Sequence, residues 1–518
     1  MSAASDTAGR GPRDRSSGAG RNRRRGAVLA AVAVAGTLCA TLSPGIAAGA
    51  ARVASASSPA VSWGRAEEVP GLGALNAGGN ASVGWVSCRR VGYCSAAGTY
   101  TDVSGHGQPF VVNESKGRWG KAEEVPGIAA LSVGQGAGIG QLSCAAAGYC
   151  SAGGSYTDAS GHGQPFVVNE SKGRWGKAEE VPSTAALNAG GSAGIGQLSC
   201  PSKGNCTAGG TYTDKAGNPE AFVVNEKAGR WGKAEEVPGI PALKAVGGAR
   251  LQALSCGSAG NCAVGGYYLI APNLPGDGDD EWEAYVVTEV NGRWGKAEEV
   301  PGTAALNANG QAQVSTLSCP SAGNCAAAGF YAPSQQVGLT AFVVSESKGR
   351  WGKAHQVRGL PGPTAINPGG YPNMLSCPSA GNCAGGGYYS VGFSGFYHAF
   401  VVSEKNGKWG KVEQVPGTAA SAVLYVNTVS SVSCSSAGNC GAGGTYGNTR
   451  DYGETRAFVD SERDGKWGKA EEAPGTMALN LGGDATVNSV SCPSARRCVA
   501  AGSYTDHNGK TQAFVGGG

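Results

Sequence analysis

The sequence lacks the patterns that are typical of helical, membrane-spanning and nucleic-acid-binding proteins. No repeated segment keeps an apolar 3.6-residue period long enough for an extended amphipathic helix. Charged residues make up only 15% of the 518 residues, and beyond residue 25 they form no basic stripe for nucleic acid. Apart from residues 27–42, no apolar run approaches the roughly 20 residues of a membrane-spanning helix. Instead, 89 glycines and 25 prolines indicate a turn-dense, all-β chain.

The first 56 residues have the organisation of a secretory signal. Arginine-rich residues 1–25 precede an apolar run, Ala27–Leu42, and two small-residue sites, Ala48–Ala50 and Ala54–Ala56. We predict a signal peptide over residues 1–50 (or 1–56), a linker over 51–60 and one domain over 61–518. Because residues 1–25 hold seven arginines against two aspartates, removing them takes the net charge from +4 to about −1. A retained N-terminal anchor is the alternative.

These features predict a protein that is secreted or displayed at the cell surface. We expect a monomer that has no membrane span once the signal is removed and does not bind nucleic acid. The export route and the cleavage site stay open, because Arg24–Arg25 match the twin-arginine pattern poorly.

The chain returns eight times to a segment resembling Gly-Arg-Trp-Gly-Lys-Ala-Glu-Glu-Val-Pro, at spacings of 56 to 63 residues. Its tryptophans are Trp63, Trp119, Trp175, Trp231, Trp294, Trp351, Trp409 and Trp467. A fixed period of this size is the signature of a repeat architecture. Each unit holds four short runs of β-branched, aromatic or alternating apolar residues, separated by Gly, Ser or Asp clusters, which predict four strands. We name these strands a to d in chain order, strand d being the tryptophan strand.

Sixteen of the 17 cysteines form eight pairs that bracket the turn between strands a and b. The pairs are Cys88 with Cys94, Cys144 with Cys150, Cys200 with Cys206, Cys256 with Cys262, Cys319 with Cys325, Cys377 with Cys383, Cys434 with Cys440, and Cys492 with Cys498. In an exported protein such constant spacing is typical of disulfides. Zinc is the alternative, but its ligand pairs usually have about two to four residues between them, and no histidine recurs beside these cysteines. Cys39 falls within the signal.

The two ends of the chain predict a closed ring. The mature chain begins with a lone d strand, Val61–Pro70, and ends with a c strand, Gln512–Val515, that no d strand follows. In a linear solenoid both ends would be edges that need caps. In a ring of four-stranded blades, the N-terminal strand completes the last blade. We therefore predict an all-β, eight-bladed β-propeller, with the Ala- and Gly-rich strand b near the axis and the Trp strand outside.

Two patterns carry a family resemblance. The hairpins Ser345–Trp351 and Ser403–Trp409 resemble a shortened Asp-box turn of sialidase-like propellers, with its aspartate missing and one residue deleted. The unit Ser-Cys-x5-Cys-x-Ala-x-Gly-x-Tyr, followed by Gly-x-Trp, is similar to repeats of secreted actinobacterial propeller proteins. The resemblance covers all eight units and implies a propeller fold, but it implies little about activity because propellers have many roles.

Two sets of turn residues are candidate binding residues. The b–c turns and d–a links should emerge on one face of the ring, and the a–b and c–d turns on the other. The first face has the longer loops, where binding residues usually lie. The candidates there are Asp102, Asp158, Asp214, Asp506, Asn76, Asn188, Asn307, Asn367 and Asn480. The alternatives are that these side chains only shape their turns, or that the site lies at the c–d turns near Lys116 and Lys172.

An acidic insertion, Leu269–Glu283, lengthens the fourth unit. Asp277, Asp279, Asp280 and Glu283 could gather oxygen ligands around calcium, although their spacing differs from that of standard calcium loops. A solvated acidic loop is the alternative. We expect no other cofactor.

The near-identity of the units favours a multivalent binding or scaffold protein. Its predicted partner is a cell-wall or extracellular glycan, or a surface protein. A propeller glycoside hydrolase or polysaccharide lyase is the less favoured alternative, because such enzymes gather unlike acids, bases and arginines on one face and this sequence does not concentrate them. A purely structural coat role is the third. The recurring tryptophans could stack on ligand, but we favour packing between blades.

Overall fold

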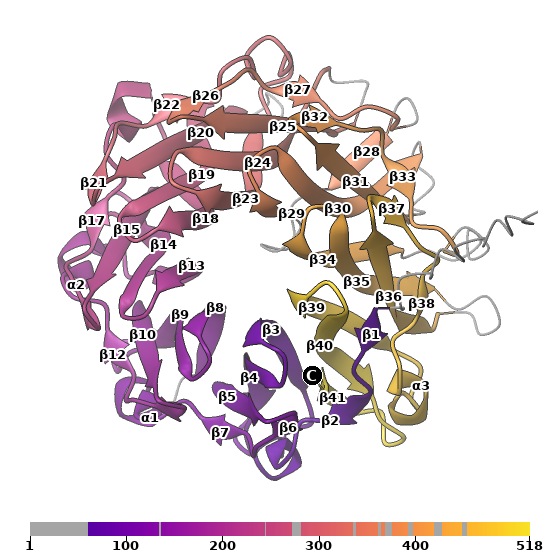
Figure 1. Ribbon diagram of the computed structural model, residues 1–518. Coiled ribbons are helices and arrows are strands. Elements are labelled where there is room, and N and C mark those ends of the chain that lie inside the picture. Colours follow the sequence, from indigo (N-terminus) through magenta and orange to yellow (C-terminus); the bar gives the residue numbers. More distant parts are fainter. Residues whose placement is uncertain are drawn as a thin grey trace, which may run out of the picture. The chain divides into compact units, whose positions relative to one another are not determined.

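The computed structural model describes residues 61–133, 136–243, 245–271, 281–334, 338–360, 364–367, 375–391, 397–418, 427–447 and 453–517. One compact unit spans Pro59–Gly518. Within it, eight β-sheets surround a central axis (Figure 1). The prediction of an eight-bladed propeller is therefore confirmed, whereas the predicted signal peptide and linker lie outside the described residues. None of the described helices is long and apolar enough to cross a membrane.

Each blade runs from strand a at the axis to strand d at the rim, and strand d consists of two short pieces. Both pieces pair with strand c in blades 1 to 7, whereas in blade 8 one pairs with strand c and the other with strand b. Blade 1 contains β3 (Ala81–Arg90), β4 (Tyr93–Thr101), β5 (Gly107–Ser115), β6 (Arg118–Trp119) and β7 (Glu123–Glu124). Blade 2 contains β8 (Ala137–Ala146), β9 (Tyr149–Thr157), β10 (Gly163–Ser171), β11 (Arg174–Trp175) and β12 (Glu179–Glu180). Blade 3 contains β13 (Ala193–Ser202), β14 (Asn205–Thr213), β15 (Pro219–Lys227), β16 (Arg230–Trp231) and β17 (Glu235–Glu236). Blade 4 contains β18 (Ala249–Ser258), β19 (Asn261–Ala271), β20 (Glu281–Val290), β21 (Arg293–Trp294) and β22 (Glu298–Glu299). Blade 5 contains β23 (Gln313–Ser321), β24 (Asn324–Tyr331), β25 (Thr340–Ser347), β26 (Arg350–Trp351) and β27 (His355–Gln356). Blade 6 contains β28 (Thr364–Asn367), β29 (Leu375–Ser379), β30 (Asn382–Val391), β31 (Tyr397–Lys405), β32 (Lys408–Trp409) and β33 (Glu413–Gln414). Blade 7 contains β34 (Thr428–Ser436), β35 (Asn439–Gly447), β36 (Thr455–Arg463), β37 (Lys466–Trp467) and β38 (Glu471–Glu472), and blade 8 contains β39 (Ala485–Ser494), β40 (Arg497–Thr505), β41 (Thr511–Gly516), β1 (Ser62–Trp63) and β2 (Ala66–Glu68).

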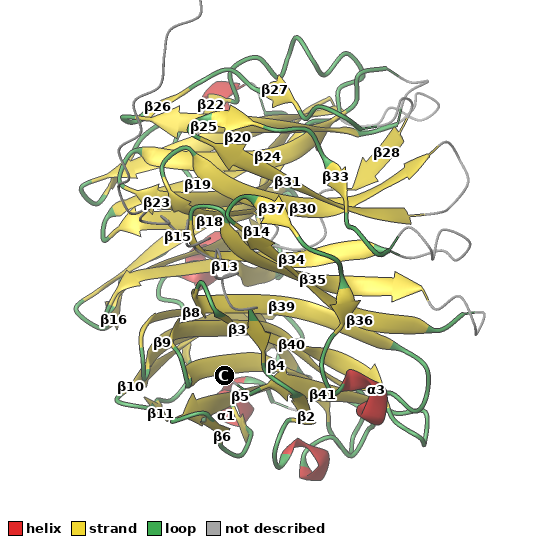
Figure 2. Ribbon diagram, turned by 45° about the vertical axis from the view of Figure 1, so that its right-hand side comes forward, coloured by secondary structure: helices red, strands yellow, loops and turns green. Residues whose placement is uncertain are grey.

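The helices are single turns in the links between blades. They are η1 (Leu72–Ala74), α1 (Ile128–Leu131), α2 (Thr184–Leu187), η2 (Ile240–Leu243) and α3 (Thr476–Leu479). In Figure 2 strands fill the propeller and the short helices lie at its edge. This agrees with the lack of a sustained helical period in the sequence.

A closed ring of hydrogen bonds joins the innermost strands. The serine before the first cysteine of each pair accepts a bond from the backbone N–H of the cysteine in the next blade. Ser87 Oγ thus bonds Cys144 N at 3.2 Å, and Ser491 Oγ returns to Cys88 N at 2.9 Å. The other six bonds are alike, at 2.9–3.1 Å. The recurring Ser-Cys pair therefore has two roles, one within the blade and one between blades.

The prediction of eight disulfides is confirmed, because every cysteine pair is bonded within its own blade. Cys144 and Cys150, for example, lie directly opposite each other on β8 and β9. The bond therefore closes the a–b hairpin at its mouth, as the constant spacing predicted, and leaves no role for zinc at these cysteines. The bonds join Cys88 to Cys94, Cys144 to Cys150, Cys200 to Cys206, Cys256 to Cys262, Cys319 to Cys325, Cys377 to Cys383, Cys434 to Cys440, and Cys492 to Cys498.

Strand b is the second strand from the axis, near it as predicted, and close contacts on both sides account for its small residues. In β9, a Cβ at Gly154 would lie 1.9 Å from the carbonyl oxygen of Gly138, where strand a bulges inward. A Cβ at Gly153 would lie 2.8 Å from the side chain of Ile195 in the next blade. One glycine therefore accommodates the bulge and the other the neighbouring blade.

The N-terminal strands complete blade 8, as predicted. Strand β2 pairs antiparallel with β41, with Glu67 opposite Val515. Strand β1 pairs in parallel with β40, with Trp63 opposite Cys498. It does so because β41 ends at Gly516 and leaves that edge of β40 open, whereas in blade 7 the end of strand c covers the corresponding edge.

The hydrophobic core lies between neighbouring blades. Val111 of blade 1 packs in one cluster with Leu142 and Phe166 of blade 2, and similar clusters recur around the ring. The tryptophans also belong to these contacts: Trp175 is only 8% exposed, and its indole N–H donates to Asn113 of the preceding blade at 3.2 Å. They therefore pack between blades, as we favoured, and are not a free stacking row.

Candidate functional site

The ring has two faces that differ in their loops. We call the face with the b–c turns and d–a links the loop face, and the face with the a–b and c–d turns the hairpin face. On the loop face, Gly190 N of a link donates to Thr213 O beside a b–c turn at 2.9 Å. On the hairpin face, Gly173 N of a c–d turn donates to Gly148 O of the a–b turn at 3.0 Å. The hydrogen bonds therefore group the turns as the sequence predicted.

The candidate aspartates cap their own b–c turns on the loop face. Asp158 Oδ1 accepts bonds from the backbone N–H of Ser160 at 2.8 Å and of His162 at 3.0 Å. Its Oδ2 accepts from Gln164 Nε2 at 3.1 Å. The backbone N–H of His162 and then the Gln164 amide hold the pKa of Asp158 below its usual value. Asp102, Asp214 and Asp506 make equivalent turn contacts. Turn formation thus accounts for much of their hydrogen-bonding capacity.

The candidate asparagines in the d–a links are more deeply placed. Asn188 is 6% exposed, and its Nδ2 donates to Gly163 O at 2.9 Å and to Gln164 Oε1 at 3.2 Å. Gln164 thus connects Asn188 to Asp158, and Gln512 connects Asn76 to Asp506 in the same way.

Of the other three asparagines, Asn307 and Asn480 make backbone contacts like those of Asn188, and only Asn367 differs. Asn307 is 5% exposed and bonds the backbone of Gln311 and Ala332. Asn480 bonds Thr455 O and Thr505 N, both at 3.4 Å. Asn367 lies within strand β28 opposite Tyr388, not in a turn. No bound ligand tests the binding role of these residues, which stays a prediction.

Of the calcium candidates, Asp277, Asp279 and Asp280 lie outside the described residues. Glu283 lies in β20 opposite Tyr268. Burial raises the pKa of Glu283 to about 7, and a hydrogen bond from Asn307 opposes this. Over the described residues, no group of three His, Cys, Asp or Glu side chains is placed to hold a metal ion.

A groove of about 530 Å³ lies among blades 6, 7 and 8 toward the loop face. Eight threonines and serines line it, together with Tyr388, Tyr397, Ala485 and Asp484. Thr445 Oγ1 donates to Thr486 Oγ1 at 2.6 Å across the junction of blades 7 and 8. Asp484 accepts from the hydroxyl of Thr455 at 3.0 Å. Candidate Asn480 bonds the backbone of two lining residues, so part of the predicted set supports this groove.

Two aromatic pairs mark the same end of two blades. Tyr388 and Tyr397 meet edge to face, with ring centroids 4.9 Å apart, and Tyr397 is 38% exposed. In blade 4, Tyr267 and Trp282 occupy the same positions of strands b and c, with centroids 5.8 Å apart. These residues are not among the candidates that the sequence suggested. Aligning the units would have shown them, because the position before the strand-b tyrosine is Thr or Ser in five other units.

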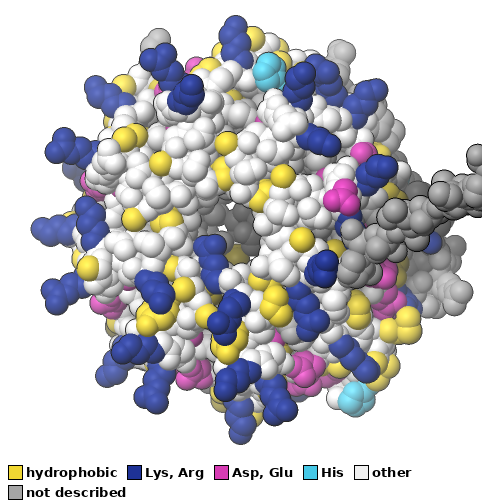
Figure 3. Space-filling model, in the orientation of Figure 1, with side chains coloured by type: hydrophobic (Ala, Val, Ile, Leu, Met, Phe, Trp, Pro, Cys, Tyr) yellow, Lys and Arg dark blue, Asp and Glu magenta, His cyan; other side chains and the backbone are white. Residues whose placement is uncertain are grey.

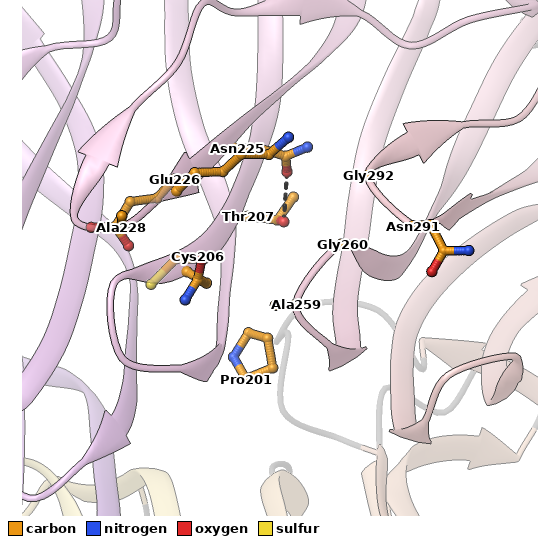
Figure 4. Close-up of a pocket in the computed structure, with 12 residues that line it drawn as sticks. Pro201, Cys206, Thr207, Asn225, Glu226, Ala228, Ala259, Gly260, Asn291 and Gly292 are labelled. Carbon is orange, nitrogen blue, oxygen red and sulfur yellow. Dashed lines mark hydrogen bonds between the residues drawn. The ribbon is translucent and has the colours of Figure 1, made fainter.

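The hairpin face has crevices between blades. A crevice of about 470 Å³ lies between blades 3 and 4 (Figure 4), whereas its counterpart between blades 5 and 6 holds about 20 Å³. Within the larger crevice, Thr207 Oγ1 donates to Asn225 Oδ1 at 2.7 Å, and Asn225 Nδ2 donates to Glu289 of the next blade at 2.7 Å. These polar groups therefore already serve the contact between blades.

A row of buried glutamates continues this contact around the ring, with one glutamate near the end of each complete strand c. Asn113 of blade 1 donates to Glu170 Oε1 of blade 2 at 2.7 Å and accepts from Trp175 of the same blade. Burial raises the pKa of Glu170 to about 7, with hydrogen bonds from Ser95 and Asn113 opposing this. The row comprises Glu114, Glu170, Glu226, Glu289, Glu346, Glu404 and Glu462.

Comparisons with known proteins identify neither a family nor a function for this chain. No protein-family model and no curated protein sequence matches this chain. Among solved structures, the β-propeller domain of the Trilobed protease from Pyrococcus furiosus has 7% identity and a TM-score of 0.40, over 76% of this chain and 98% of that one. An ulvan lyase of a new polysaccharide lyase family has 12% identity and a TM-score of 0.40, over 85% and 94%. An α-L-arabinanase from Penicillium chrysogenum has 12% identity and a TM-score of 0.32, over 60% and 89%. Such distant propellers differ in activity and indicate no function for this chain.

Proposed function

We propose that this protein is a secreted glycan-binding scaffold whose binding site is the groove among blades 6, 7 and 8. The observation that carries the proposal is the lining of that groove: two tyrosines beside eight hydroxyl side chains. Sugar rings present apolar faces that pack on aromatic rings, and hydroxyls that exchange hydrogen bonds with Thr and Ser. The volume is within the range of small-ligand sites, roughly 300–1,000 Å³.

Binding is favoured over glycoside hydrolysis because of the carboxylates. Hydrolysis usually needs two acids on opposite sides of the scissile bond. Among the residues that line the described groove, Asp484 is the only acid, and it already accepts two hydrogen bonds from Thr455. A lyase or hydrolase stays the alternative, and release of reducing ends from a bound polysaccharide would support it.

The aromatic pair of blade 4 extends the proposal to a second contact with the glycan. Tyr267 and Trp282 of blade 4 lie at the positions that Tyr388 and Tyr397 take in blade 6. One extended chain that reached both pairs would gain affinity from the second contact without a new kind of site.

The test is a glycan array followed by affinity electrophoresis on each polysaccharide that retains the protein. The double variant Tyr388→Ala/Tyr397→Ala should weaken retention at least about tenfold, because aromatic contacts dominate such sites. Tyr149→Ala is the matched control, since this tyrosine lies at an a–b turn with the Lys203 ammonium 4.0 Å from its ring centroid. Retention that is unchanged in the double variant, or an array without any bound glycan, would contradict the proposal.

A further inference from the structure

The hairpin face gathers cations that are far apart in the sequence. The a–b turns between the paired cysteines contain five Lys and Arg residues, and the c–d turns between the buried glutamate and the tryptophan contain thirteen. Against these eighteen cations, the same turns contain one acid, Asp464. Figure 3 shows Lys and Arg side chains around the rim of the ring and near its central opening. The fold therefore builds a basic face from residues that the sequence spaces about one repeat apart.

The tips of the c–d hairpins have the same shape in seven blades. Each tip is a two-residue turn with positive φ at both positions, for example 53° at Lys172 and 78° at Gly173. A cation follows each turn and is exposed: Arg118, Arg174, Arg230, Arg293, Arg350, Lys408 and Lys466. A backbone bond to the neighbouring a–b turn, such as Gly349 N to Gly323 O at 2.8 Å, fixes each tip. The backbone positions of these cations are thus equivalent in the seven blades and fixed by hydrogen bonds.

We propose that the hairpin face docks on an anionic lipid surface. A linear polyanion would fit a stripe or a groove of cations. Cations on hairpin tips around a ring can all contact one partner at the same time only if that partner is a flat anionic surface. Each Lys or Arg close to such a membrane adds to the attraction, which decays within a Debye length. Several tips acting together therefore give binding that depends strongly on salt.

The path of the chain gives the two faces different surroundings. The chain enters the ring at Ser62, whose N–H donates to Arg496 O in the a–b turn of blade 8 at 2.8 Å. It therefore enters on the hairpin face. Docking by this face would leave the loop face, with the groove of the proposed function, directed away from the membrane.

Co-sedimentation with vesicles tests the proposal, using residues 51–518, which keep every strand of the ring. The protein should sediment with vesicles of phosphatidylglycerol and phosphatidylcholine, not with phosphatidylcholine alone, and should be released as salt rises. Arg174→Glu/Arg350→Glu should weaken binding at least about tenfold. Lys215→Glu/Lys510→Glu removes the same net charge from the loop face and should have little effect.

Three outcomes would overturn the proposal. They are no binding to the anionic vesicles, equal weakening by the two variants, and binding to inorganic polyphosphate without binding to vesicles, which would indicate a soluble polyanion. Glycan retention by the groove is a separate readout, so either proposal can fail while the other stands.

Discussion

The two faces of the ring use the same repeats in opposite ways. On the hairpin face the turns are short, disulfides close the a–b turns, backbone bonds connect them to the c–d turns, and exposed cations stand above a row of buried glutamates. On the loop face the turns vary, aspartates cap them, and the groove and the aromatic pairs break the eightfold repetition. The uniform face suits an extended, uniform partner, and the irregular face suits a specific ligand.

Two carboxyl groups, one near each face, show the same contrast between the faces. The pKa of Glu170, beneath the hairpin face, is raised by burial, while the pKa of Asp158, on the loop face, is lowered by hydrogen bonds. The raised pKa of Glu170 reflects a cost in free energy of packing the blades together. The lowered pKa of Asp158 reflects the stabilising hydrogen bonds of its turn. The two faces should therefore respond differently to mutation and to pH.

The largest expected effect, on stability, comes from deleting the N-terminal strands that complete blade 8 and close the ring. Deleting residues 61–70 removes β1 and β2, and with them the bond from Trp63 to Ser461 Oγ at 3.0 Å and the bond from Tyr504 to Glu68. The edges of β40 and β41 are then unpaired, so we expect aggregation. If the protein stays monomeric, we expect Tm to fall by at least about 10 °C, because several buried contacts are lost together. Calorimetry and light scattering measure both.

A shorter deletion separates the two faces. Removing residues 61–64 takes away only β1, which pairs beside the a–b turn of blade 8 on the hairpin face. We expect an intermediate fall in Tm. A monomeric long deletion as stable as the parent would contradict closure by the N-terminal strands.

A smaller effect is expected from one disulfide of the hairpin face. Cys144→Ser/Cys150→Ser should lower the free energy of unfolding by about 2 kcal/mol, the chain-entropy value for so small a loop. Denaturant titration measures this. Glycan retention by the groove should be unchanged, since the bond lies on the opposite face. Lost retention would show that the two faces are coupled.

The sequence predicted most of the fold because the fold is repetitive. The tryptophan period gave the number of blades, the unmatched strands at the two ends gave closure, and the cysteine spacing gave the disulfides. The specific contacts that require Gly153 and Gly154 in strand b could not be predicted, because the bulge of strand a and the approach of Ile195 appear only in three dimensions.

The site was less predictable because it depends on departures from the repeat. Our search weighted residues common to many units, such as Asp158 and Asn188, and the structure uses these to build turns and links. Tyr397 and its neighbours occur in single units and were passed over. The basic face was missed because its cations lie about one repeat apart in the sequence, so no local window contains more than a few of them.

The smallest expected effect, on stability against pH, compares the two carboxylates directly. The folded-state pKa of Glu170 is about 7 against an ordinary value of 4.5, so the folded state holds more protons than the unfolded state between these values. Stability should therefore fall as pH rises through this window. Glu170→Gln keeps an acceptor for Asn113 and a group that can pair with Ser95, and it should raise Tm above pH 7 but have little effect near pH 4.5. For Asp158 the folded-state pKa lies below its ordinary 3.8, so its contribution is complete above about pH 5 and is lost as the pH falls further. Asp158→Asn should therefore lower Tm slightly at pH 7, and by less as the pH approaches 3. Scanning calorimetry of both variants from pH 3 to 8 measures these differences, and curves parallel to that of the parent would contradict the contrast between the two faces.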